Sequence, residues 1–360
     1  FAGNMRAGTA AAVDGTSESG LINQILGQLI RQDTTSNLLT VLNATIPVVE
    51  SALVEGCGGD GKRNFAVYGT EGDHARAAGG FAGRLTGAVI GTKGTQGSVV
   101  IDGISSVSAD ENAGGFFGTA DVDGVASVSG DSHTSILDIV GLGGVDVLNA
   151  FRTYIYGAQV KGSVQYGLSV DALGTGGQKS GSETDAQYRL GSAGGFGGSL
   201  LDSTVENAVV TGLKKVNAAN YAGGFIGLTG KSGVVDLSDT SVLQNLLKAS
   251  AGVIDVFGSP IRNASVTGYS DGYTVKGSGG SETIAGGFVG FGDLTRIENC
   301  HASLLKQVYS DQTAGGFIGK TNFSYLAEIN AGSPVLLKPV LQVVNELLKL
   351  LHVGDLENLG

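Results

Sequence analysis

Apolar and polar residues alternate in short segments of this chain, and the segments recur. In three of them an aliphatic residue is followed by a charged residue, an Asn and a small residue: Val205–Ala208, Ile261–Ala264 and Ile297–Cys300. Alternation with a period of two is typical of a strand that buries one face. Asn tolerates a positive φ and bonds to its own backbone, so Asn207, Asn263 and Asn299 predict bends that end these strands.

A six-residue motif, Ala-Gly-Gly-Phe-x-Gly, punctuates the pattern. Its copies lie at 78–83, 113–118, 193–198, 222–227, 285–290 and 314–319, and Phe1-Ala2-Gly3 matches the second half of a further copy. Long and short spacers alternate, so two motifs make one super-repeat, at about 1–115, 116–224, 225–316 and, in part, 317–360. Such regular repetition indicates a single repetitive solenoid over residues 1–360.

The motif phenylalanines suggest how this solenoid is held together. In a right-handed parallel β-helix, successive turns stack about 4.8 Å apart. Rings at equivalent positions would then lie inside, at a separation that ring pairs favour. The flanking glycines would let the backbone bend beside a large ring. We therefore expect these residues to form a structural repeat: Phe81, Phe116, Phe196, Phe225, Phe288 and Phe317.

The long spacers carry apolar residues at helical spacing instead. These stretches are Leu21–Ile30, Ile136–Phe151, Val242–Phe257 and Val335–Leu351. They predict helical excursions from the solenoid, one per two-motif super-repeat, aligned along one side because insertions at equivalent positions emerge on one face. Leu26, Leu246, Leu341 and Leu348 would be buried there. The competing interpretation is a set of unrelated loops.

The segments Gly223–Gly227, Gly286–Gly290, Gly315–Gly319 and 297–302 resemble the GLUG repeat of large bacterial surface proteins. Phe stands where Leu is typical of that repeat, and the helical stretches fall outside the resemblance. The resemblance implies a β-solenoid at the cell surface and supplies no catalytic residue.

Composition narrows the functional classes. Glycine accounts for 62 of 360 residues and hydrophobic residues for 41%, which fits a packed fold with many tight turns. The net charge is −11, and the 22 Lys and Arg residues are scattered along the sequence. Nucleic acid and anionic lipid are therefore not expected partners, because both require clustered positive charge. No apolar run is long enough to predict membrane insertion.

Catalytic and metal-binding patterns are not evident. Cys57 and Cys300 are expected in different repeats, which argues against a disulfide between them, and Cys300 occupies the place that Ala208 and Ala264 hold in sister repeats. His74, His133, His301 and His352 form no HExxH motif. Calcium could bind at the acidic Asp-Gly turns, although plain turns are favoured. These turns begin at Asp60, Asp102, Asp123 and Asp271.

These features predict a structural or adhesive segment of a secreted bacterial cell-surface protein, without enzymatic activity. It would act as a rigid stalk or as a surface for a protein or glycan ligand on a host or neighbouring cell, with the solenoid continuing at both ends. The alternative is a β-helix polysaccharide lyase or glycosidase. Ligand contacts are expected at the least repetitive segments, Asn149–Arg189 and Lys62–Ala77.

Overall fold

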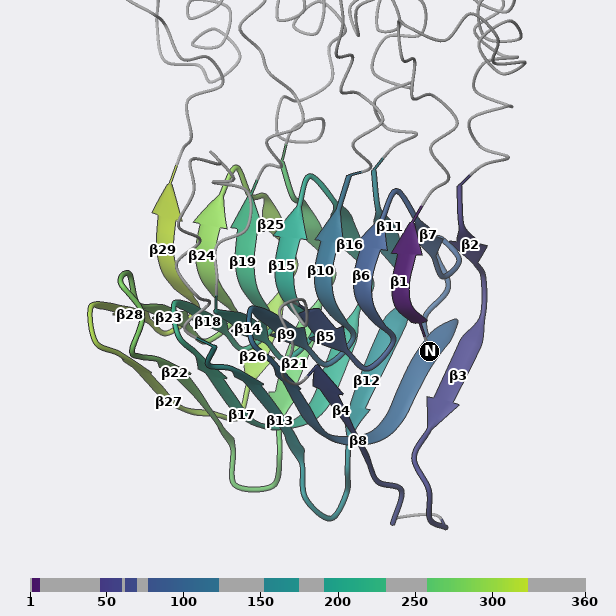
Figure 1. The fold of residues 1–360 in the computed structure, drawn as a ribbon, viewed down its shortest axis with the longest axis horizontal. Helices are drawn as coiled ribbons and strands as arrows, with labels where there is room; N and C mark the ends of the chain where they lie inside the picture. The colour runs from purple at the N-terminus through teal and green to yellow at the C-terminus, as the bar shows by residue number, and fades with distance from the viewer. Residues whose placement is uncertain are drawn as a thin grey trace, which may run out of the picture.

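The computed structural model describes residues 2–6, 46–59, 62–69, 77–122, 152–174, 191–230 and 258–322, and these residues form four sheets of parallel strands (Figure 1). Sheet A has seven strands: β1 (Ala2–Arg6), β6 (Ala82–Thr86), β10 (Phe117–Asp121), β15 (Gly197–Leu201), β19 (Ile226–Gly230), β24 (Val289–Asp293) and β29 (Ile318–Asn322). Sheet B has six: β2 (Val48–Val49), β7 (Val89–Ile90), β11 (Tyr154–Tyr156), β16 (Thr204–Glu206), β20 (Ile261–Arg262) and β25 (Ile297–Glu298).

The other two sheets complete the cross-section. Sheet C has ten strands: β3 (Ala52–Glu55), β4 (Phe65–Gly69), β8 (Val99–Ala109), β12 (Ala158–Gly162), β13 (Leu168–Ala172), β17 (Val209–Ala218), β21 (Ser265–Gly268), β22 (Tyr273–Gly277), β26 (His301–Ser303) and β27 (Leu305–Ser310). Sheet D has six: β5 (Ala77–Gly79), β9 (Asn112–Gly114), β14 (Ser192–Gly194), β18 (Tyr221–Gly223), β23 (Ile284–Gly286) and β28 (Thr313–Gly315).

The chain passes through sheets A, B, C and D in that order and then returns to sheet A. We call one such passage a circuit. Each strand pairs with its counterparts in the circuits before and after it, so strands distant in sequence lie side by side. The mainly β architecture with parallel sheets, predicted from the repeated alternating segments, is confirmed.

Alternation of side chains explains why these residues form strands around one core. On sheet B the inward positions are aliphatic in successive circuits, with Ile90, Ile155, Val205 and Ile261 fully buried. The residues between them point outward and are less buried. Sheet C repeats the pattern with inward Val and Ile residues, and the buried side chains of the four sheets merge into one cluster.

Circuits alternate in the connection from sheet A to sheet B. In every second circuit the connection is short, at 87–88, 202–203 and 294–296. In the circuits between, the two strands are separated by longer segments, which include 7–45, 123–151 and 231–257. Three of the predicted helical stretches fall in these segments and the fourth follows β29, so all four lie outside the described residues. The residues that the structure describes contain no helix, and therefore no helix that could span a bilayer.

Candidate functional surface

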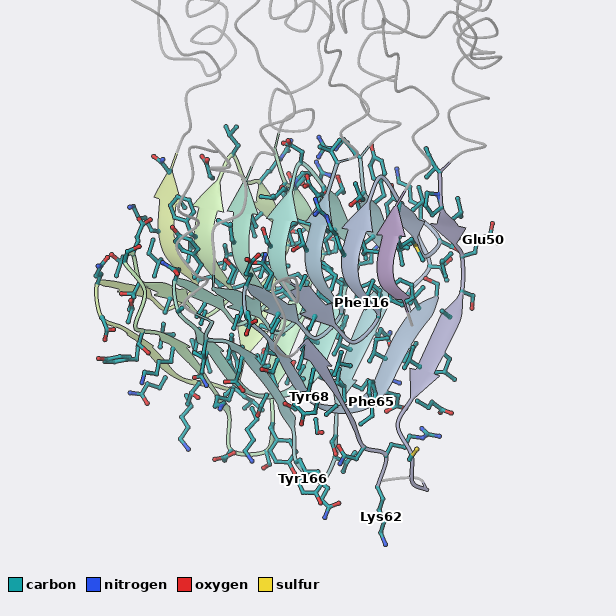
Figure 2. The ribbon with its side chains drawn as sticks, viewed as in Figure 1. Glu50, Lys62, Phe65, Tyr68, Phe116 and Tyr166 are labelled. Atoms are coloured by element: carbon teal, nitrogen blue, oxygen red, sulfur yellow. The ribbon has the colours of Figure 1, made fainter. Side chains whose placement is uncertain are left out.

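The six motif phenylalanines form one column of stacked rings at the corner between sheets D and A. Neighbouring ring centroids are 4.8 to 5.1 Å apart, and the ring planes are within 5° of parallel. Phe81 to Phe288 are fully buried, and Phe116 lies between the sheets in Figure 2. Phe317 is 36% exposed, because no ring of the described residues covers its outer face. The expected stacking of rings inside the fold is therefore observed.

Backbone bonds accompany the rings. The N–H of each phenylalanine donates to the carbonyl of the next one in the column, at 2.8 Å from Phe81 to Phe317. The first two motif glycines allow this close stacking. A Cβ on Gly223 would lie 1.8 Å from the carbonyl oxygen of Ile226, and one on Gly224 would lie 2.0 Å from that of Gly287. The glycines are thus required by close approach of the backbone, rather than by an unusual φ.

The predicted asparagine bends lie between sheets B and C. Asn207, Asn263 and Asn299 have φ of 56°, 51° and 51°, in the left-handed region that Asn tolerates. The Asn299 side-chain amide donates to Asn263 Oδ1 at 3.2 Å, so equivalent side chains of adjacent circuits are bonded.

Beside these bends is a small network of ion pairs. Glu298 contacts Arg262 at 2.8 Å and Arg296 at 2.5 Å. The hydrogen bond from Arg262 is the main reason that the pKa of the Glu298 carboxyl is lowered. These groups are partly exposed, so the network contributes little to the stability of the fold.

The candidate reactive side chains do not converge. Cys57 is exposed and Cys300 half-buried, and both are free thiols. Burial raises the pKa of the Cys300 thiol, which packs at the edge of the core. His301 is exposed on β26, while His74, His133 and His352 lie outside the described residues. Across the described ranges, no three His, Cys, Asp or Glu side chains gather as a metal site would require.

Two of the four Asp-Gly pairs lie in the described residues. Asp271 is in a turn, as expected, whereas the prediction of a turn at Asp102 is wrong: it lies within β8, where Gly103 forms a bulge at a φ of 86°. Asp102 forms an ion pair with Arg63 at 2.8 Å, and Asp271 forms one with Lys306 at 3.1 Å. The hydrogen bond from Lys306 is the largest influence lowering the pKa of Asp271. Each carboxylate thus faces a side-chain cation. Asp60 and Asp123 lie outside the described part of the chain.

The least repetitive segments contribute exposed aromatic residues to the outer side of sheet C. In the described part of Lys62–Ala77, Tyr68 on β4 is 63% exposed. In the described part of Asn149–Arg189, the loop between β12 and β13 carries Tyr166, which is 47% exposed and projects from the molecule in Figure 2. The loop is bonded to the connection between β21 and β22, two circuits further along the chain, because the Tyr269 hydroxyl donates to the Val164 carbonyl at 2.6 Å.

Sequence reasoning missed a concentration of lysines on sheet C, which we call the lysine face. Its members lie in four consecutive circuits: Lys161, Lys214, Lys215, Lys276 and Lys306. Lys214 and Lys306 occupy β-bulges, where one strand carries an extra residue relative to its partner. They are far apart in sequence, and only the register of the strands brings them together.

The lysine face contains an open depression of about 310 Å³ between β17, β22 and β27. It is lined by Asn217, Thr274, Val275, Lys276, Gln307 and Tyr309. Lys276 Nζ lies 5.5 Å from the centroid of the Tyr309 ring. The Tyr309 hydroxyl donates to Asp311 at 2.8 Å, and this hydrogen bond is the main reason that the pKa of Tyr309 is raised. The lining therefore offers amides, a hydroxyl, an ammonium group and an aromatic ring.

Comparisons with models of protein families, with curated proteins and with solved structures give no match for this chain. Its function has to be argued from the repeat and from the chemistry of its surface.

Proposed function

We propose that this chain is a structural and adhesive segment of a secreted bacterial cell-surface protein, built as a right-handed parallel β-solenoid. The observation that carries the proposal is the fixed order in which the chain visits the four sheets, with one motif phenylalanine at the same corner of each circuit. A coil of this kind is extended by adding circuits, and each circuit contacts only its neighbours. A stalk or spacer is the role that suits such a coil.

Rigidity follows from the continuity of the contacts between circuits. Parallel strands on all four sides and the phenylalanine column join each circuit to the next. Each stacked ring pair contributes about 0.5–1.5 kcal/mol beyond the burial of its area. Bending the coil would have to open this column or one of the sheets, so we expect a stiff rod that holds its outer surface at a fixed spacing.

The extracellular location rests on the resemblance of the Gly-Gly-Phe-x-Gly segments to GLUG repeats, and on a composition with only 15% charged residues. The helical layer is part of the same proposal. The apolar stretches in the long connections would pack side by side along the corner between sheets A and B.

Deleting whole super-repeats tests the coil. Removal of 225–316 joins Gly224 to Phe317, which restores an intact motif, and should shorten the rod by about 10 Å while leaving it folded. Small-angle scattering measures the length and circular dichroism the β content. As a matched control, removal of 226–263 joins the end of sheet D to the start of sheet C and should prevent folding. If both deletions fold equally well, the chain is not a solenoid of equivalent circuits.

A further inference from the structure

The depression on the lysine face has the groups that recognise a sugar. Asn217, Thr274 and Gln307 supply amides and a hydroxyl, and the partly exposed Tyr309 ring lies beside them. Binding sites typically combine apolar or aromatic surface with a few placed polar groups that set orientation. Here the ring is held by the hydrogen bond from its hydroxyl to Asp311, which limits its motion before a ligand arrives.

The charge of the lining adds a second requirement. Lys276 is the only ionisable group besides the Tyr309 phenol among the residues that line the depression. Two carboxylates neighbour the lining. Asp171 accepts a hydrogen bond from Asn217 at 2.5 Å and forms an ion pair with Lys215 at 3.3 Å, and Asp311 accepts a hydrogen bond from the Tyr309 hydroxyl at 2.8 Å. In a chain of net charge −11, a depression with an ammonium group and no carboxylate in its lining favours an anionic ligand.

We propose that this depression binds an acidic sugar residue of a carboxylated polysaccharide, with Lys276 facing the sugar carboxylate. The polymer would continue over the lysine face, because Lys214 and Lys306, the latter in an ion pair with Asp271, lie on the flanking strands. The inference deepens the adhesive part of the proposed function, on which it rests. It also places the ligand surface on strands of consecutive circuits, rather than on the non-repetitive loops alone.

The experiment measures binding of polygalacturonate to the full chain by isothermal titration calorimetry. Fully methyl-esterified polygalacturonate is the matched probe, since it keeps the backbone and removes the charge. Lys276→Gln and Tyr309→Ala should each weaken binding about tenfold, the effect expected when a charge-assisted contact or a ring platform is removed. Lys93→Gln, which changes an exposed lysine on the loop between sheets B and C of another circuit, should leave binding unchanged.

Each of the following results would overturn the inference: equal binding of the esterified polymer, no binding by the wild-type chain, or equal losses in Lys276→Gln and Lys93→Gln. Stronger binding of double-stranded DNA than of polygalacturonate would also do so, because it would make the lysine face a general polyanion surface. Thermal unfolding of each variant shows whether its fold is intact. If the chain binds no polysaccharide but shortens as expected on deletion of 225–316, this inference is wrong while the proposed role as a stalk still holds.

Discussion

Replacement of Phe225 by Ala tests the phenylalanine column where it is most enclosed. The ring is fully buried and lies 4.8 Å from Phe196 on one side and 4.8 Å from Phe288 on the other. Truncating a buried Phe to Ala costs about 3–5 kcal/mol, because apolar burial is lost and a cavity remains. Two lost ring contacts, at about 0.5–1.5 kcal/mol each, are included in that figure and place the expected value in its upper half.

Urea unfolding followed by circular dichroism gives the change in the free energy of unfolding, and hydrogen exchange shows whether it is confined to neighbouring circuits. Phe317→Ala is the matched control, since that ring is 36% exposed and, among the described residues, stacks on Phe288 alone. It should cost about 1–2 kcal/mol, in proportion to its smaller burial. Equal losses for the two substitutions would refute the argument that stacking between circuits stabilises the fold.

Further substitutions test other parts of the repeat. Gly224→Ala should destabilise the fold by several kcal/mol, on the order of an overpacked core or more. Gly316→Ala, at the equivalent position but with open space around its Cβ, should be tolerated. Thermal unfolding measures both variants, and equal losses of stability would count against the close-approach argument. Asn263→Ala should cost about 1 kcal/mol, because Ala is strained at the φ of 51° that this bend requires, whereas Asn263→Gly should avoid that strain. Similar melting temperatures for the two variants would show that the bend is not strained. Cys57 should react with iodoacetamide at pH 8 much faster than Cys300, because burial raises the pKa of the Cys300 thiol and makes its thiolate scarcer. Peptide mass spectrometry measures both rates, and equal rates would contradict the half-buried placement of Cys300.

The corner between sheets D and A could be predicted in detail because its sequence barely varies. Each motif position meets the same neighbour in each circuit, so Phe must stack on Phe and the glycines must admit a backbone oxygen. The asparagine bends could also be predicted from the sequence, because few residues other than Asn and Gly adopt a positive φ without an energetic cost.

Sheet C shows where sequence reasoning ends. Its inward position is Leu168, Leu213 or Tyr273 in successive circuits, and Tyr273 is tolerated in the core because its hydroxyl donates to the Gly287 carbonyl at 2.6 Å. That bond depends on packing between sheets, which no local pattern encodes. The lysine face was missed for a related reason. Bulges change the register of β17 and β27, and the positions of Lys214 and Lys306 follow from that register.

The alternation of short and long connections between sheets A and B sets a fixed interval along the molecule. Long connections begin and end at the same corner in every second circuit, and two circuits advance the chain by about 10 Å. The circuits thus bring the ends of the long connections to one corner at a regular interval, and sequence inserted at this corner can change or lengthen without disturbing the strands that space it.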